Sequence, residues 1–153
     1  MDYSVREANS EDLDVLVSFV AAEAREAEGI VLAPEILAEG ISFGLKNRDL
    51  VLYWVVETRN KEVVGNISIV KEWSDWNAGF YWWVQSIYVK PAFRGKQLAR
   101  LLLQHVTQEG REEKAVEVRL YTCADNHRAI AAYRRAGFTE TRYRIMTRPI
   151  PGA

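Results

Sequence analysis

The chain has 153 residues, of which 48% are hydrophobic and 27% charged, and its formal net charge is −1. This length and composition predict one globular domain over residues 1–153 and exclude a disordered chain. We expect no membrane-spanning segment and no signal peptide, because no run of 18 apolar residues and no basic leader followed by an apolar stretch occurs. The single Cys123 cannot form an internal disulfide, which fits a cytoplasmic location.

The small net charge hides an uneven distribution. Residues 1–76 contain 15 acidic and 7 basic side chains, whereas residues 77–153 contain 6 acidic and 13 basic ones. No acidic residue lies between Trp76 and Gln108. We therefore expect the two halves to face different partners. The overall balance is too neutral for a protein dedicated to duplex DNA, so we expect neither a nucleic-acid nor a membrane partner.

The chain begins with a strand and two helices. Residues 3–8 predict the strand, and Asn9 or Ser10 can cap a helix with apolar residues at helical spacing. Gly29 is expected to end that helix. Pro34 suits the first turn of a second helix, which two glycines weaken.

Three strands follow. Residues 50–57 and 62–70 are separated by a polar turn and predict a hairpin, and residues 80–89 form a long aromatic and β-branched strand. Pro91 breaks the hydrogen-bonding ladder after it.

The rest of the chain alternates helix and strand. We predict a helix over 95–109, a strand over 115–122, a helix over 126–136 and a last strand over 138–148. The order β-α-α-β-β-β-α-β-α-β is that of a mixed α/β sheet, with antiparallel pairing in the hairpin and parallel pairing across the later helices.

The turn before the helix predicted at 95–109 carries the clearest chemical signal. A strand ends, a short turn with Gly95 follows, and a helix begins whose free N–H groups carry partial positive charge. Arg94, Lys96 and Arg100 add full charges. This pattern predicts an anion site that a pyrophosphate would match, although a basic helix start can also be merely solvated.

Two other phosphate-binding patterns are absent. A dinucleotide-binding turn needs G-x-G-x-x-G after the first strand, and a nucleoside-triphosphate loop needs G-x-x-x-x-G-K-[ST]. The mid-chain turn has one glycine and matches neither pattern. The phosphate is therefore expected to belong to neither NAD nor ATP.

Residues 89–99 read VKPAFRGKQLA and resemble the pyrophosphate motif of the GNAT N-acetyltransferase superfamily, approximately V-x-P-x-x-[RQ]-G-x-G-x-[GA]. Residues 126–138 are similar to its second signature, N-x-x-A-x-x-x-Y-x-x-x-G-F. The resemblance implies a GNAT-like mixed central β-sheet whose splayed central strands form an acetyl-CoA cleft. It also implies direct acetyl transfer to an amine in a ternary complex, with no metal.

The resemblance implies which residues bind acetyl-CoA. The backbone near Ile87 to Val89 would hold the thioester carbonyl and the pantetheine arm. Gln97 departs from the motif, which has a second glycine there, and we expect it to serve as an ordinary helical residue. The implied cofactor-binding residues are Ile87, Tyr88, Val89, Arg94, Gly95, Lys96, Gln97, Leu98, Ala99, Arg100, Asn126, Ala129 and Tyr133.

The resemblance also assigns a general acid but leaves the base open. Tyr133 matches the tyrosine that protonates the departing thiolate, although it could also be a core residue, and Asn126 could cap its helix, bind the cofactor or do both. The strand at 80–89 offers no carboxylate. The candidate bases are therefore Glu72 foremost, then Asp75, Glu26 and Glu28, or a water chain to backbone carbonyls.

The acceptor side is predicted from charge and aromatic residues. Glu23, Glu26, Glu28, Glu35 and Glu39 suit a small cationic amine, and Trp82, Trp83 and Gln85 are candidate pocket residues. Trp82 and Trp83 should face opposite sides of their strand. The alternatives are a protein or peptide acceptor and a catalytically silent CoA-binding module, and a homodimer is an expectation from the family.

Overall fold

The structure, a computed structural model, describes residues 2–152. Its elements in chain order are β1 (Tyr3–Glu7), α1 (Leu13–Glu28), α2 (Pro34–Lys46), β2 (Val51–Thr58), β3 (Val63–Ser74), β4 (Gly79–Val89), α3 (Leu98–Glu112), β5 (Glu117–Arg119) and α4 (His127–Arg135), with 3₁₀ turns at Ser10–Asp12 and Pro91–Phe93. They fall into two compact units, the first ending at Tyr121 and the second beginning at Thr122.

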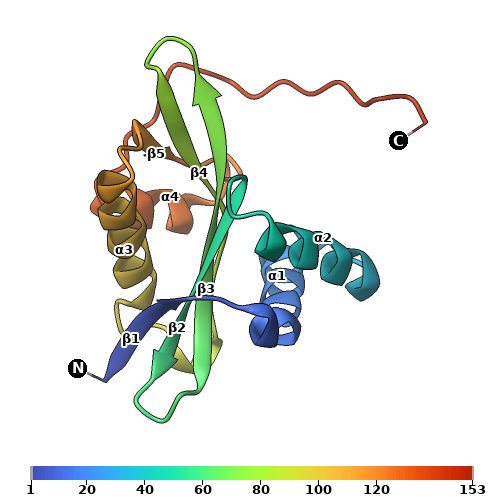
Figure 1. The fold of residues 1–153 in the computed structure, drawn as a ribbon, viewed down its shortest axis with the longest axis vertical. Helices are drawn as coiled ribbons and strands as arrows, with labels where there is room; N and C mark the ends of the chain where they lie inside the picture. Colours follow the sequence, from blue (N-terminus) through green and yellow to red (C-terminus); the bar gives the residue numbers. More distant parts are fainter. Residues whose placement is uncertain (1, 153) are drawn as a thin grey trace. The chain divides into compact units, whose positions relative to one another are not determined.

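The first unit is built on one mixed sheet of five strands in the order β1-β2-β3-β4-β5 (Figure 1). The first three pairings are antiparallel, and β4 pairs with β5 in parallel. Both the hairpin and the parallel pairing that the sequence predicts are confirmed. The parallel pair is joined through α3, as a parallel connection requires.

Helices cover both faces of this sheet, with α1 and α2 on one side and α3 on the other (Figure 1). Because successive strand residues point to opposite faces, β2 supplies both halves of the core. Tyr53 and Val55 pack with Leu16 of α1 and Ile41 of α2. Trp54 faces α3, where its ring lies 5.8 Å from that of His105. This is why β2 is apolar on both faces.

Local signals fix the ends of α1. Asn9 accepts a hydrogen bond from the Glu11 N–H, and Asp12 accepts one from the Asn9 N–H, so the two residues form a capping box on the 3₁₀ turn Ser10–Asp12 that leads directly into α1. Gly29 ends the helix in a left-handed conformation with φ of 66°. Both predictions, the cap and the stop, are confirmed.

A β-bulge divides β4. Ser86 lies opposite Ser68, but Val84 lies opposite Ile69, so Gln85 is the extra residue. The pairing with β5 covers only Tyr81 to Trp83. Within the described residues of the first unit, the β5-side edge of β4 has no strand partner after Trp83. This edge of β4 therefore has no strand neighbour from the bulge onward, on the side where the resemblance places the acetyl-CoA cleft.

The second unit contains α4 and an extended tail. Asn126 caps α4 by accepting a hydrogen bond from the Ala129 N–H at 3.2 Å, which confirms its predicted capping role. The strand predicted over 138–148 is wrong for the described structure, in which residues 138–150 adopt no regular secondary structure. A strand exists only through its ladder of hydrogen bonds, and the apolar alternation at Tyr143 and Ile145 supplies no paired neighbour by itself.

Candidate active site

The start of α3 is built to receive an anion. Gly95 and Gln97 both adopt positive φ, 79° and 65°, so the backbone turns sharply before the helix begins. No side chain caps this helix start, and its first turn contains no acidic residue. Its orphan N–H groups, with Arg94 and Lys96 beside them, form a cradle that fits a pyrophosphate.

Gln97 corrects one expectation. It is not a helical residue but the left-handed N-cap of α3, which begins at Leu98. The position therefore does require the backbone conformation that favours glycine, and Gln97 is strained there. This explains physically why the motif has glycine at this place.

Replacing Gln97 by Gly is expected to stabilise the protein by roughly 1 kcal/mol, because glycine adopts positive φ without the Cβ clash. In a chain of this size that difference raises Tm by about 2–4 °C, measured by thermal unfolding. Gln104→Gly is the matched control, since Gln104 is exposed inside α3 and glycine there should lower Tm instead. An unchanged or lower Tm for Gln97→Gly would contradict the strain.

Glu23 of α1 lies against the unpaired edge of β4. Its Oε2 accepts a hydrogen bond of 2.9 Å from the Ile87 backbone N–H, just after the bulge. The next aromatic pair along this face, Phe19 of α1 and Tyr88 of β4, packs with ring centroids 5.4 Å apart. Among the described residues, the β4 amide that donates to a carboxylate is thus one of those that the motif resemblance assigns to the thioester carbonyl.

The environment of Glu23 makes it more basic than an ordinary glutamate. Burial raises its pKa, and the nearby Glu28 acts in the same direction. Hydrogen bonds from the Ile87 N–H and the Ser86 side chain oppose that shift without cancelling it. A half-buried carboxylate of raised pKa, held beside a free strand edge, has the properties of a general base.

Glu26, one turn further along α1, joins the helix to the pyrophosphate turn. Its carboxylate accepts hydrogen bonds from the Tyr88 hydroxyl at 2.7 Å and from Arg94 Nη2 at 2.8 Å. The Nε of Arg94 donates to the Val89 carbonyl at 2.9 Å. The Tyr88 hydrogen bond and Arg94 lower the pKa of Glu26, so it stays ionised. Glu26 therefore positions Arg94 at the end of β4.

The other predicted site residues lie in different places. Glu72 lies opposite Tyr81, six residues before Ile87, which corresponds to about 20 Å along the strand. Trp82 is 1% exposed and lies on the α3 side, with its ring 6.1 Å from that of Trp54. Trp83 points to the opposite face, as predicted, and its ring lies 6.2 Å from that of Tyr121. Gln85 and Glu28 are exposed, Gln85 at the bulge and Glu28 at the end of α1.

Tyr133 belongs to the second unit, on α4. It is half-buried, and its ring contacts that of Phe138 in an edge-to-face arrangement at 5.9 Å. The Phe138 N–H returns to the Tyr133 carbonyl at 3.0 Å. The signature over 126–138 thus forms one local structure, a capped helix closed by its own aromatic pair.

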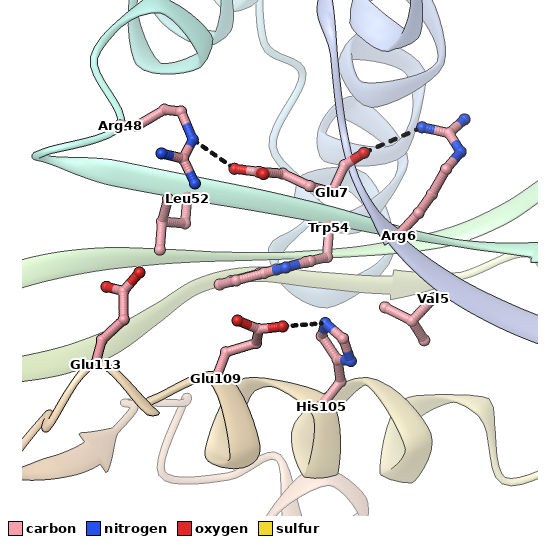
Figure 2. A pocket seen from close by; sticks show the side chains of 9 residues that line it. All are labelled: Val5, Arg6, Glu7, Arg48, Leu52, Trp54, His105, Glu109 and Glu113. Carbon is pink, nitrogen blue, oxygen red and sulfur yellow. Dashed lines mark hydrogen bonds and ion pairs between the residues drawn. The ribbon is translucent and has the colours of Figure 1, made fainter. Parts of the chain in front are cut away.

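A separate cavity lies on the α3 side of the sheet (Figure 2). Its volume is about 210 Å³, and it is lined by Val5, Arg6, Glu7, Arg48, Leu52, Trp54, His105, Glu109 and Glu113. Figure 2 shows two ion pairs in its lining, Arg48 with Glu7 at 2.6 Å and, along α3, His105 with Glu109 at 3.4 Å. Because Trp54 faces α3, this cavity is on the other face of the sheet from Glu23.

Residues 2–152 contain neither a metal-ligand cluster nor a membrane-crossing helix. No three His, Cys, Asp or Glu side chains in this range gather in an arrangement that could hold a metal ion. No helix described there has both the length and the apolar character needed to cross a membrane.

Comparisons with known proteins give the family and the fold. The family model of the GNAT acetyltransferases matches residues 16–138, which include most of α1, the whole hairpin, the pyrophosphate turn and α4. The chain belongs to the GNAT acetyltransferase family. It is thus an acetyl-CoA-dependent N-acetyltransferase by family, with the mixed α/β sheet that this family shares. No curated protein sequence matches it.

Solved structures of similar fold cover almost the whole chain. A possible acetyltransferase from Clostridium difficile 630 has 30% identity and a TM-score of 0.92, over 98% of this chain and 99% of that one. An integron cassette protein from the mobile metagenome of Cole Harbour Salt Marsh has 26% identity and a TM-score of 0.83, over 97% and 91%. A predicted acetyltransferase from Clostridium acetobutylicum, solved with acetyl-CoA, has 21% identity and a TM-score of 0.77, over 95% and 96%. The last of these supports the GNAT fold alone.

Sequence reasoning did not identify Glu23 as a candidate base. It counted Glu23 only among the acidic residues of the acceptor side. The sequence does contain a signal that groups Glu23 with other site residues. Phe19, Glu23 and Glu26 lie on one face of α1, at spacings of four and three residues. What the sequence did not contain was the strand that this face would meet.

Proposed function

We propose that this GNAT enzyme transfers acetyl from acetyl-CoA to a primary amine by direct attack in a ternary complex, with Glu23 as the general base. The observation that carries the proposal is the Glu23 carboxylate on the Ile87 N–H, at the unpaired edge of β4. A proton acceptor and an oxyanion donor are thus adjacent, and acyl transfer to an amine needs both.

The residues present fit acetyl-CoA. The left-handed turn at Gly95 and Gln97 presents backbone N–H groups of the α3 start to a pyrophosphate, beside Lys96 and Arg100. The unpaired edge of β4 offers backbone groups to a pantetheine arm in the manner of an added strand. Acetyl-CoA, when bound, supplies the activated acetyl carbonyl.

The chain's own groups then move the protons and hold the carbonyl. Glu23 takes a proton from the substrate ammonium, which frees the nitrogen lone pair for attack on the carbonyl carbon. The Ile87 N–H donates to the carbonyl oxygen as negative charge develops there. A C–N bond forms, the C–S bond breaks, and the thiolate leaves with the sulfur electron pair. Tyr133 protonates this thiolate, a role that rests on the motif match. The nitrogen, now bonded to the acyl carbon, gives up its second proton to water, and a proton from water restores the Tyr133 phenol.

Replacing Tyr133 by Phe is expected to lower kcat by about 10²-fold, because the thiolate then leaves without its proton donor. Acetyl-CoA affinity should stay unchanged, since Phe retains the ring that packs on Phe138. Steady-state kinetics gives kcat, and calorimetry gives the acetyl-CoA Kd. A wild-type kcat in Tyr133→Phe would remove Tyr133 from the reaction.

For the acceptor, we propose a small cationic metabolite. The last two turns of α1 contain Glu23, Glu26 and Glu28. On β4, Gln85 is the bulge residue and Trp83 lies two positions before it. Carboxylates and an aromatic face together favour an ammonium group. Trp82 is buried on the opposite face, so we assign the aromatic wall to Trp83. A peptide N-terminus or lysine is the second candidate, since the same charges suit it.

A panel of polyamines, amino acids, aminoglycosides and peptides, followed by release of free CoA thiol, tests this function. We expect turnover with a small cation that exceeds turnover with any peptide. Preference for a peptide would select the second candidate. Tight acetyl-CoA binding with no thiol release across the whole panel would contradict catalysis and favour a silent CoA-binding module.

A further inference from the structure

Asn66 is a buried polar residue whose side-chain oxygen is not used in a hydrogen bond. It lies on β3, is 0% exposed, and its Oδ1 has no partner. Its Nδ2 donates to the Ser86 hydroxyl at 3.3 Å. An unpartnered buried amide oxygen is costly, so a core position of this kind calls for an explanation beyond packing.

Ser86 links Asn66 to Glu23. It follows the bulge in β4, is 5% exposed, and its side chain makes a hydrogen bond that lowers the pKa of Glu23. Asn66 donates to Ser86, and the N–H of the next residue, Ile87, donates to Glu23, so the three side chains follow one line from the core to the strand edge. Along this line the Ser86 side chain favours the charged form of Glu23. The bulge at Gln85 makes this possible, because the shift in register puts Ser86 on the α1 side of the sheet.

Glu23 has two donors, and one of them has a second use. The Ile87 N–H is the group that the thioester oxygen needs in the proposed reaction, yet here it donates to Glu23. When that N–H turns to the thioester oxygen, only the Ser86 hydroxyl still donates to the carboxylate. The loss of one donor also makes the carboxylate more basic at the moment a base is required.

We propose that Ser86, anchored by Asn66, is the positioning residue that keeps the Glu23 carboxylate beside the substrate amine when the Ile87 N–H donates to the thioester oxygen instead of to Glu23. This inference rests on the proposed function for its consequence in catalysis. The line from Asn66 to Glu23 and the exchange of partners at Ile87 can both be tested without any turnover of substrate.

The charged and titratable groups around this line are few. Glu26 and Glu28 lie on α1 with Glu23, and the Tyr88 phenol lies on β4. Arg94 approaches from the turn after β4 and is held by Glu26. Since Tyr88 and Arg94 both bind Glu26, the titration of Glu23 depends mainly on its burial, Ile87, Ser86 and Glu28.

The test is a pH titration of the ¹⁵N-labelled full chain, in which the Ile87 amide signal reports the charge on Glu23. We expect the midpoint to move to higher pH in Ser86→Ala, because the charged carboxylate loses a donor, and to return toward the wild-type value in Ser86→Thr. Ser68→Ala is the matched control, a buried serine directly opposite Ser86, and should leave the midpoint unchanged. An unchanged midpoint in a folded Ser86→Ala protein would overturn the proposal.

Saturating acetyl-CoA without amine tests the exchange of partners. We expect the Ile87 signal to shift and to stop following the Glu23 titration. If it still follows that titration, the exchange is overturned. If the titrations behave as expected but no amine is ever acetylated, the link from Asn66 to Glu23 is retained and the proposed function fails. Failure of the inference and failure of the proposed function are therefore distinguishable.

Kinetics gives the functional readout. Ser86→Ala should lower kcat by about 10–100-fold, through misplacement of the base, and should shift the acid limb of the pH profile in the same direction as the NMR midpoint. Asn66→Leu should lower kcat while leaving Tm equal or higher, because it removes an unpartnered buried oxygen. A fall in Tm with a wild-type kcat would show that Asn66 has only a structural role and would overturn its part in the proposal.

Discussion

Replacing Glu23 by Gln is expected to lower kcat/KM for the amine by about 10²–10⁴-fold, the usual contribution of a positioned general base. Glutamine keeps the shape of the side chain, and its amide oxygen can still accept the hydrogen bond from the Ile87 N–H. It cannot take a proton from an ammonium. The fold should therefore survive while the proton transfer is lost, and steady-state rates with a fixed amine measure the difference.

The assignment of Glu23 as the general base also predicts the direction in which activity changes with pH. Glu23 acts as a base only when deprotonated, and burial raises its pKa above the ordinary 4.5. Activity should therefore fall as the pH drops through that raised value, and this acid limb should be absent from the residual activity of Glu23→Gln. Asp14→Asn, at the exposed start of α1, is the control and should keep wild-type activity. Loss of turnover in Glu72→Gln instead of Glu23→Gln would contradict the assignment.

Replacing Arg6 by Ala is expected to destabilise the protein by roughly 3 kcal/mol. Arg6 lies on β1, and its guanidinium bonds Asp12 at 2.8 Å and Glu57 at 3.0 Å. These two carboxylates are only 6% and 4% exposed, so removing Arg6 leaves the buried Asp12 without an ion-pair partner and Glu57 with Lys61 alone. We place the effect at the low end for buried pairs because the Arg6 side chain is itself 35% exposed. Urea unfolding measures it.

The pH dependence of this pair follows from its pKa shifts. Arg6 lowers the pKa of Asp12 below 3.8, and Arg6 with Lys61 lowers that of Glu57 below 4.5 despite its burial. Their contribution to stability is therefore present above those ordinary values and is lost as the pH falls through the lowered ones. The stability gap between wild type and Arg6→Ala should narrow in acid.

The exposed Arg48 provides the control for Arg6. It pairs with Glu7, and the two side chains are 61% and 44% exposed, so Arg48→Ala should cost less than about 1 kcal/mol. Equal effects of the two arginine substitutions would show that burial of the carboxylates is not the cause.

Much of this molecule follows from local signals in the sequence. The capping residues Asn9 and Asn126 and the stop at Gly29 each act within a few neighbouring residues, so their effects could be predicted without the fold. The pyrophosphate turn is similar, because a strand end and a helix start define it.

The features that could not be predicted depend on contacts between distant segments. The contact of Glu23 with Ile87 joins residues 64 positions apart, and no local pattern sets it. The bulge at Gln85 is set by the register of β4 against β3, which strand periodicity does not reveal. The expected last strand shows the same limit, since apolar alternation at Tyr143 and Ile145 does not supply a paired neighbour. Gln97 was misjudged because its φ depends on where α3 begins.

The most direct test of acetyl transfer to an amine is a mass balance. The protein is mixed with acetyl-CoA and the best amine of the panel, and free thiol, acetylated amine and the mass of the protein are measured together. Direct transfer predicts equal amounts of thiol and acetylated amine, with the protein mass unchanged even when the amine is omitted. Thiol release without acetylated amine, or an acetyl group retained on the protein, would contradict it.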